Sequence, residues 1–386
     1  MLQILSLLTF VIWLVIFFLW GQFWRVWEFD AGRARFPSRD RWPTVAAVVP
    51  ARNEAETIGA VLRGLAAQDY SGEFSIVIVD DHSRDGTAEI ARRTADEAGV
   101  ASRTIIVRAS ELQPGWTGKL WSLNLGANVA ADMTPEFLWF TDADIMHSTD
   151  TLRNLVSNAE SGKLDLTSLM VLLKAESFVE RLLIPPFVYF FLMLYPPRWI
   201  ADSKSRTAAA AGGCILLRRS SLERAGGLAA IRGEVIDDCA LARIVKKSGG
   251  KIWMGLTRSS RSLRAYTNSS EIRDVIARTA FTQLRYSALN LLGTLLGLGV
   301  TFLVPFVLTF SSNIHVWPFA LAAWCLMTAS FLPAVTLYRL SPFWAPLLPF
   351  SALFYAFATC LSAVRYWLGR GGQWKGRAQA SKPISQ

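Results

Sequence analysis

Long uncharged apolar runs lie near both ends of the chain. Leu2–Trp20 is interrupted only by Gln3, Ser6 and Thr9 and is long enough to cross a bilayer as a helix. It lacks a basic segment before it and a small-residue cleavage site after it, so we predict a retained anchor over residues 1–24 rather than a signal peptide. Further apolar runs predict about three membrane helices within residues 289–367: Leu289–Phe310, Trp317–Leu337 and Ala345–Tyr366.

Between these runs, residues 44–288 alternate short apolar segments with segments of helical periodicity. This alternation predicts an α/β domain with a doubly wound, mainly parallel, Rossmann-like sheet. Right-handed crossovers would place every strand-to-helix loop at one edge of that sheet. The predicted strands are Thr44–Val49, Phe74–Val79, Thr104–Val107, Phe137–Thr141, Leu164–Leu173 and Gly213–Leu217.

Two carboxylates, Asp142 and Asp144, follow the apolar strand Phe137–Thr141. In extended chain, residues two apart point the same way, so both side chains can aim at one point beyond the strand. Ligands of open α/β sheets bind at that edge. Two hard oxygen donors there suit Mg²⁺ or Mn²⁺ bridging a diphosphate. The alternative is an acidic loop that only caps the strand.

Polar pairs also follow three other predicted strands. They are Asn53 with Glu54, Asp80 with Asp81, and Gly118 with Lys119. If the sheet is parallel, these pairs should converge with Asp142 and Asp144. Asn53 and Glu56 additionally have the spacing of a helix capping box.

A second acidic pair, Asp237 and Asp238, begins a segment of helical periodicity that ends at Gly249-Gly250. The alternative for such a pair is a helix N-terminus stabilised by the helix dipole. A third segment, Thr282–Tyr286, contains Gln283 and Arg285 on a predicted helix Glu271–Leu289. Taken alone, that segment is an ordinary helix beside a membrane span.

The segment 182–199 is apolar and aromatic but contains Pro185, Pro186, Pro196 and Pro197. We predict an interfacial segment at the membrane surface, with a buried core helix as the alternative. His82 and His147 lie beside the acidic motifs. Local hydrogen bonding is the commoner role for such histidines, and metal ligation is the alternative.

Composition supports a membrane protein. The chain has 386 residues, 52% of them hydrophobic, and a net charge of +10. Arginines in a predicted connector, 25–43, and lysines and arginines in a predicted tail, 368–386, account for much of this charge. Basic residues beside spans favour the cytoplasmic face and anionic headgroups, so we predict no nucleic-acid partner. With three C-terminal spans the two basic ends fall on opposite sides, so either one apolar segment is re-entrant or interfacial, or the charge rule does not hold for this chain. The four cysteines lack metal-like spacing, and we predict that they are reduced.

In this order, the motifs resemble those of family 2 glycosyltransferases, the inverting enzymes of GT-A fold. The resemblance covers roughly Thr44 to Tyr286 and rests on motifs within residues 48–54, 79–87, 118–119, 142–144 and 237–238. Over its whole length the chain most resembles the bacterial hopene-associated glycosyltransferases. The resemblance implies a multi-pass protein of the bacterial inner membrane with a cytoplasmic catalytic domain.

The family pattern implies a role for each matched residue. Pro50, Ala51 and Glu54 would line the base and ribose of a nucleotide sugar, and Asp81 would contact the base. Asp142 would lie near the ribose and phosphates, and Asp144 would hold the divalent metal, with Asp142 as its neighbour.

The remaining matched residues concern the reaction itself. Asp238 would be the general base that takes the proton of the acceptor hydroxyl. Asp237 stands where the family usually has Glu, which leaves open whether Asp237 or Asp238 is the base. Lys119 and Arg285 could neutralise the leaving diphosphate. Thr282 and Tyr286 replace the ends of the motif of processive synthases, which favours transfer of a single sugar.

We therefore predict transfer of one sugar from a nucleotide sugar, with uridine as the expected base, to a lipid alcohol such as a hopanoid. One alternative is a polyprenyl-phosphate glycosyltransferase, whose acceptor is already an anion. Another is a non-catalytic membrane scaffold, against which the intact carboxylates argue. The sugar, the acceptor and the oligomeric state are left open by the sequence.

Overall fold

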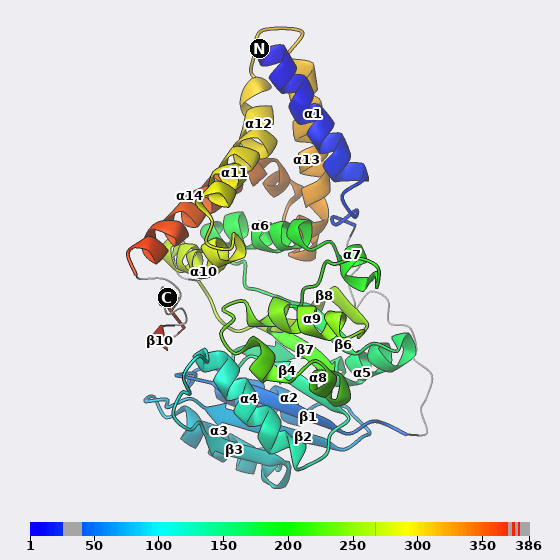
Figure 1. Cartoon of the computed structure of the whole chain (residues 1–386), viewed down its shortest axis with the longest axis vertical. Coiled ribbons are helices and arrows are strands. Elements are labelled where there is room, and N and C mark those ends of the chain that lie inside the picture. The colour runs from blue at the N-terminus through cyan, green and yellow to red at the C-terminus, as the bar shows by residue number, and fades with distance from the viewer. Residues whose placement is uncertain (26–40, 267, 370–372, 375–376, 379–386) are drawn as a thin grey trace. The chain divides into compact units, whose positions relative to one another are not determined.

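The chain is described by a computed structural model, which covers residues 1–25, 41–266, 268–369 and the backbone of 373–374 and 377–378 (Figure 1). Its contacts divide it into two compact units. The helical unit comprises Met1–Val26, Lys174–Trp199 and Ala265–Gly372, and the sheet unit comprises Trp27–Leu173, Ile200–Arg264 and Gln373–Gln386. Most of the predicted connector 25–43 and tail 368–386 lies outside the described residues.

The sheet unit is built on one eight-stranded sheet with the order β3-β2-β1-β4-β7-β6-β8-β5. The first four strands in that order are parallel, β7 is antiparallel to both neighbours, β6 is parallel to β8, and β5 is antiparallel to β8. The predicted α/β class is confirmed, with a mixed second half. The strands are β1 (Val45–Ala51), β2 (Phe74–Asp80), β3 (Thr104–Arg108), β4 (Phe137–Thr141), β5 (Ile145–His147), β6 (Leu166–Leu172), β7 (Cys214–Arg218) and β8 (Ile252–Ser262).

Helices follow the parallel strands as the periodicity predicts. Every residue of β1 and β4 is buried, as expected for strands covered on both faces. Helix α2 turns Ile58, Leu62 and Leu65 into the same core. The helices of this unit are α2 (Ile58–Ala66), α3 (Thr87–Glu97), α4 (Gly118–Ala131), α5 (Thr151–Gly162), α8 (Arg219–Arg224) and α9 (Asp237–Lys247).

The predicted capping box at Asn53 is wrong. Helix α2 begins at Ile58, after Thr57, and has no side-chain cap. Asn53 instead takes a left-handed conformation with φ +51°. Its backbone N–H donates to Ser83 Oγ at 2.9 Å, and its Oδ1 accepts from the Arg84 N–H at 3.0 Å. Asn53 therefore joins the loops that follow β1 and β2.

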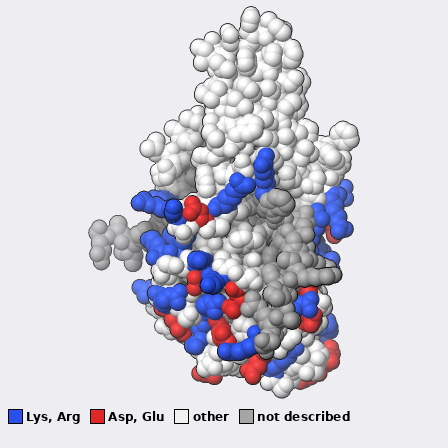
Figure 2. All heavy atoms as spheres, turned by 90° about the vertical axis from the view of Figure 1, so that its right-hand side faces the viewer, with Lys and Arg blue, Asp and Glu red and all other residues white. Residues whose placement is uncertain are grey.

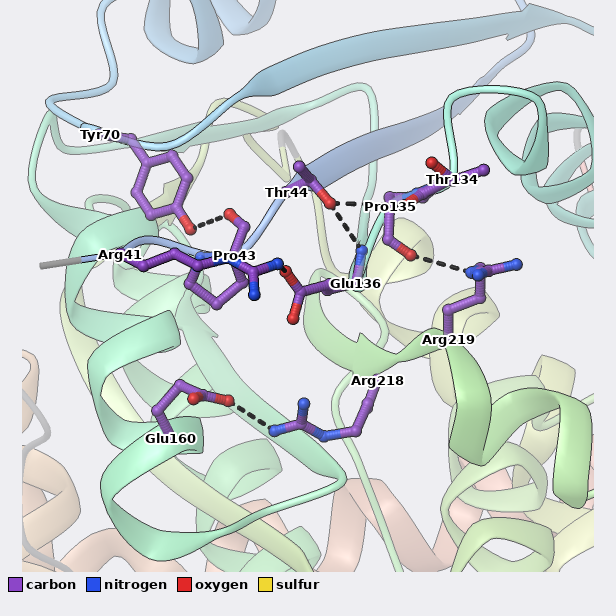
Figure 3. Close-up of polar contacts among 10 residues, drawn as sticks. All are labelled: Arg41, Pro43, Thr44, Tyr70, Thr134, Pro135, Glu136, Glu160, Arg218 and Arg219. Carbon is purple, nitrogen blue, oxygen red and sulfur yellow. Dashed lines mark hydrogen bonds and ion pairs between the residues drawn. The ribbon is translucent and has the colours of Figure 1, made fainter. Parts of the chain in front are cut away.

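Polar contacts fasten the amino-terminal edge of the parallel strands (Figure 3). Thr44 Oγ1 accepts from the Glu136 N–H at 3.0 Å, which ties the start of β1 to the start of β4. Arg218, at the end of the antiparallel β7, pairs with Glu160 of α5 at 2.6 Å. These two contacts hold the start of β1 to the start of β4, and the end of β7 to α5.

The helical unit contains three helical stretches long and apolar enough to cross a membrane, Ala288–Leu308, Trp317–Leu337 and Pro342–Trp367, and these indicate membrane association. The apolar helix α1 (Leu2–Phe18) is shorter than these. Figure 2 shows a broad uncharged surface on this unit. The first stretch contains α11 (Ala288–Leu298) and α12 (Val304–Leu308), the second is α13 (Trp317–Leu337), and the third contains α14 (Leu348–Trp367); the unit also has α6 (Phe178–Leu194) and α10 (Ser269–Gln283).

Helix α6 continues through Pro185 and Pro186, although prolines usually interrupt a helix. Pro186 has no N–H, so the carbonyl of Leu182 loses its helical partner. Ser351 Oγ, in the first turn of α14, donates to that carbonyl at 2.7 Å. Both prolines and most of the apolar side chains of α6 are buried within the helical unit, which favours the core-helix alternative for residues 182–199.

The compact units also divide the chain differently from the predicted boundary at residue 288. The division falls after Arg264, and α10 belongs to the helical unit. The predicted helix Glu271–Leu289 is two helices, because α10 ends at Gln283 and α11 begins at Ala288. All four cysteines are free thiols, as predicted.

Candidate active site

The carboxyl ends of β1 and β2 lie in register. Ala51 is the Cα partner of Asp80, and the Asp81 N–H donates to the Ala51 carbonyl at 2.8 Å. Pro50 and Ala51 are therefore the last two residues of a fully buried strand. Asp81 is buried and contacts Arg52, whose Nη1 lies 3.3 Å from Asp81 Oδ2. The sheet thus brings Pro50, Ala51 and Asp81 together at the predicted edge.

Glu54 belongs to the same loop cluster. Its backbone N–H donates to Thr87 Oγ1 at 2.9 Å, and Thr87 begins helix α3 after β2. The loops after β1 and β2 are therefore held to each other, here and at Asn53. The Glu54 carboxylate acts on the charge of Asp144, as described below.

Lys119 stands in the first turn of α4 and faces three carboxylates. Its Nζ lies 2.6 Å from Asp142 Oδ1 and 3.9 Å from Asp237 Oδ2. Burial alone would lower the pKa of Lys119, but Asp142, Asp237 and Asp238 together raise it above the ordinary lysine value. Lys119 is therefore a fixed positive charge between the loop after β4 and the start of α9.

Asp238 lies in the first turn of α9, but its side chain does not cap that helix. Its Oδ2 accepts from the Gly212 N–H at 2.9 Å, and its Oδ1 accepts from the Cys239 N–H at 2.7 Å. Burial, and then the Asp237 carboxylate, raise the pKa of Asp238 to about 6 against the opposing effect of Lys119. Asp238 therefore lies where the helix dipole favours a carboxylate, as in the alternative, but one of its oxygens is also held by Gly212 from outside α9.

Gly212 lies close to the charged groups of the site. A Cβ at this position would lie 3.3 Å from Lys119 Nζ and 3.4 Å from Asp238 Oδ2. Lys119, Asp142, Gly212, Asp237 and Asp238 all line one pocket. Its apolar lining comes from α4, β4, β7, α9 and the turn before α9: Leu120, Leu123, Phe140, Ile215, Leu228, Ile231 and Leu241.

Asp144 lies at the same edge and is mostly buried. Burial, followed by the carboxylates of Asp142 and Glu54, raises the pKa of Asp144 to about 6. Arg264 and Lys119 oppose this rise. Lys119 therefore lowers the pKa of both Asp144 and Asp238.

Arg264 is a site residue that the sequence did not reveal. It follows β8, and the neighbouring Leu263 N–H donates to the Asp144 carbonyl at 2.8 Å. No motif marks this arginine, because β8 reaches the site only through its pairing with β5 and β6. The predicted Arg285, by contrast, follows α10 in the helical unit, with φ +54°.

The histidine beside the acidic motif is not exposed for ligation. His147 is buried in β5, and its two ring nitrogens lie 2.8 Å from Thr141 Oγ1 and 2.8 Å from Ser260 Oγ. Burial lowers its pKa to about 3. The hydrogen-bonded alternative is therefore the one found. Within the described residues, no group of three His, Cys, Asp or Glu side chains could hold a metal ion without other ligands.

Comparison with known proteins bears on this arrangement. Residues 43–279 match the glycosyltransferase-like family 2. The 4,4'-diaponeurosporenoate glycosyltransferase of Staphylococcus haemolyticus is 30% identical over 102 residues, which are 26% of this chain and 24% of that protein. Glycosyltransferase AglE of Haloferax volcanii is 40% identical over 52 residues, 13% of this chain and 17% of that protein. The matches thus span no more than about a quarter of these relatives' lengths.

A solved structure shares the fold over nearly the whole chain. The mannosyltransferase PcManGT of Pyrobaculum calidifontis, determined with GDP-Man and Mn²⁺, is 18% identical with a TM-score of 0.54. The alignment covers 96% of this chain and 100% of that one. Because the family match extends over more than half of the chain, and the sheet is of the GT-A kind, this protein belongs to the glycosyltransferase-like family 2.

Proposed function

We propose that this protein is a glycosyltransferase that moves one sugar from a nucleotide sugar, with uridine as the expected base, to the hydroxyl of a membrane lipid such as a hopanoid. The observation that carries the proposal is the pocket in which Asp238 faces Lys119 and Asp142. A base in such a pocket can remove the proton of the acceptor hydroxyl while the positively charged group neutralises the leaving diphosphate. Both can act in a single displacement at the sugar. Such a displacement inverts the anomeric centre, since it needs no second nucleophilic carboxylate.

Asp238 is proposed as the general base. A carboxylate with a pKa of about 6 is a better proton acceptor than an ordinary aspartate and is still ionised at neutral pH. The N–H groups of Gly212 and Cys239 fix one lone pair on each of its oxygens. The remaining lone pairs are available to an acceptor hydroxyl, so the base is oriented before the substrate arrives.

Asp142 and Asp144 are proposed to hold a divalent cation, Mg²⁺ or Mn²⁺. The raised pKa of Asp144, caused by burial and by the carboxylates of Asp142 and Glu54, fits a place where positive charge is missing. Mg²⁺ is commonly bound by one or two carboxylates together with substrate phosphates, so two protein ligands suffice. When bound, the cation would supply Lewis-acid stabilisation of the leaving diphosphate.

Lys119 and Arg264 are proposed to add to that stabilisation. Lys119 stays charged because it lies among carboxylates, and Arg264 acts on Asp144 from the end of β8. Pro50, Ala51, Glu54 and Asp81 would then hold the nucleoside at the ends of β1 and β2, as the family pattern implies. Arg285 is proposed to contact the nucleotide sugar, and this proposal rests on the family pattern.

A lipid acceptor is favoured by the rest of the chain. Three stretches of the helical unit are apolar and long enough to cross a membrane. One relative is named for glycosylating 4,4'-diaponeurosporenoate. We propose that the protein lies in a bacterial inner membrane with the sheet unit in the cytoplasm, where nucleotide sugars are found.

The test is to incubate membranes containing the protein with UDP-linked and GDP-linked sugars and to analyse extracted lipids by mass spectrometry. We expect a lipid that gains one sugar mass with wild type and none with Asp238→Asn. Asp237→Asn is the matched control, because it removes the neighbouring charge but leaves Asp238, and it should retain transfer. Loss with Asp237→Asn and retention with Asp238→Asn would assign the base to Asp237.

Other outcomes separate the alternatives. Transfer by Asp238→Asn to a polyprenyl phosphate would favour that acceptor, since an anionic acceptor needs little help from a base. Binding of no nucleotide sugar, measured by calorimetry with Mn²⁺, would refute the proposal.

A further inference from the structure

The buried His147 belongs to a chain of polar groups behind the acidic site. Its Nδ1 lies 2.8 Å from Ser260 Oγ of β8, and its Nε2 lies 2.8 Å from Thr141 Oγ1 at the end of β4. Thr141 Oγ1 in turn donates to the carbonyl of Gly213 at 3.0 Å. All of these side chains are buried, so each polar atom depends on its partner within the chain of groups.

The chemistry of these groups fixes where each proton lies. A hydroxyl has one proton, and that of Thr141 goes to the Gly213 carbonyl. Thr141 Oγ1 must therefore accept from His147, which places the imidazole proton on Nε2. The Nδ1 atom is then an acceptor, and Ser260 donates to it. A low pKa keeps the ring neutral, so this direction of donation holds over the physiological pH range.

The far end of this chain of groups reaches the proposed general base. Gly213 is followed by β7 and preceded by Gly212, whose N–H donates to Asp238 Oδ2 at 2.9 Å. The Thr141 hydroxyl thus holds the carbonyl of the Gly213–Cys214 peptide, two peptide bonds along the chain from the Ala211–Gly212 peptide, whose N–H holds the Asp238 carboxylate. Gly212 also lies close to Lys119, so a small shift of this peptide would alter both charged groups.

We propose that His147 is a positioning residue for sugar transfer: through Thr141 it fixes the Gly213 carbonyl, and with it the adjoining Gly212, whose N–H holds Asp238 in place. This inference rests on the proposed role of Asp238 as general base. His147 does not touch the reacting atoms and does not exchange a proton during turnover. Its part is to supply one N–H, in one tautomer, to the hydroxyl that anchors the loop.

The test compares Thr141→Val, which removes the hydroxyl at nearly constant volume, with Thr141→Ser, which keeps it. Amide hydrogen exchange of the full-length protein in detergent is followed by mass spectrometry. In Thr141→Val we expect faster exchange in the peptide covering 209–215, and wild-type exchange in the peptide covering 74–80 of β2. Thr141→Ser should exchange like wild type in both.

The same variants are assayed with the nucleotide sugar and lipid extract that support wild-type transfer. For Thr141→Val we expect kcat to fall by about tenfold with donor KM unchanged, because the base is misplaced and donor contacts are not. His147→Gln, whose amide can still donate to Thr141, should retain more activity than His147→Leu. Ser260→Ala removes the hydroxyl that donates to His147 Nδ1, so the His147 tautomer is no longer fixed. We expect a loss of kcat between those of His147→Gln and His147→Leu.

Three results would overturn the inference: unchanged exchange at 209–215 in Thr141→Val, Thr141→Ser behaving like Thr141→Val, or an equal change in kcat and donor KM. Exchange that rises throughout the sheet unit would also overturn it, since that marks a general loss of stability. If wild type transfers no sugar from any donor, the proposed function fails, while the exchange data still decide whether Thr141 anchors the loop.

Discussion

Two charged neighbours act on the pKa of Asp238: Asp237 on its own helix raises it, and Lys119 from α4 lowers it. With its pKa raised to about 6, the carboxyl is protonated below that pH and cannot act as a base. We expect kcat/KM to rise with pH and to level off above an apparent pKa of about 6. Initial rates from about pH 5 to about pH 8 check this, and a rate independent of pH over that range would contradict the assignment.

Lys119 should set the pH at which this rise in kcat/KM occurs. Its ammonium group lowers the pKa of Asp238, so Lys119→Met removes a favourable interaction with the ionised carboxylate. We expect the rise of kcat/KM with pH to shift to higher pH and the donor KM to increase. The same initial-rate assay measures both. Lys247→Met is the matched control, because Lys247 is an exposed lysine on α9 away from the pocket, and both parameters should stay at wild-type values.

Site residues on the parallel strands could be predicted, because each follows a strand whose end must reach the same edge. Asp81, Lys119 and Asp142 are of this kind. Gly212 and Arg264 could not, since they reach the site through β7 and β8, whose antiparallel and long-range pairings leave no local motif. Asn53 was misassigned because the spacing to Glu56 fits a cap, whereas the loop takes a left-handed turn and bonds to Ser83.

At the scale of elements, α6 shows how a helix tolerates two prolines. The carbonyl that Pro186 leaves unpaired is taken by Ser351, and Tyr355 OH donates to the next carbonyl, that of Leu183, at 2.8 Å. Away from water, an unpaired carbonyl is costly, so the Ser351 hydroxyl replaces the hydrogen bond that Pro186 cannot donate. The proline pattern alone predicts a break, because the compensating hydroxyl lies far along the chain.

This compensation can be measured by a double-mutant cycle. Ser351→Ala should lower the free energy of unfolding by about 1 kcal/mol, because it leaves the Leu182 carbonyl unpaired. Pro186→Ala restores the N–H that the carbonyl lacked, so the serine substitution should cost less in that background. Thermal unfolding in one detergent gives the four values. Equal costs in both backgrounds would show that Ser351 does not act through this carbonyl.

Considering the whole molecule, the apolar helices predict firm integration into a bilayer. Leu296 lies in the candidate span Ala288–Leu308 and is 60% exposed. Arginine near the centre of such a span costs about 3 kcal/mol, so Leu296→Arg should lower the fraction that resists alkaline carbonate extraction. Leu296→Ala is the matched control and should remain in the membrane pellet. Full extraction of the wild-type protein would contradict membrane integration.

The interleaving of the two units constrains how the protein is made. Among the described strands, β6 pairs only with β7 and β8, and β7 lies between β4 and β6. Yet α6 of the other unit is encoded between β6 and β7. The ribosome therefore delivers a hydrophobic helix while β4 and β6 still have open edges. Neither unit is a contiguous piece of the chain, so no single cleavage releases an intact catalytic fragment, and biogenesis has to coordinate bilayer insertion with closure of the sheet.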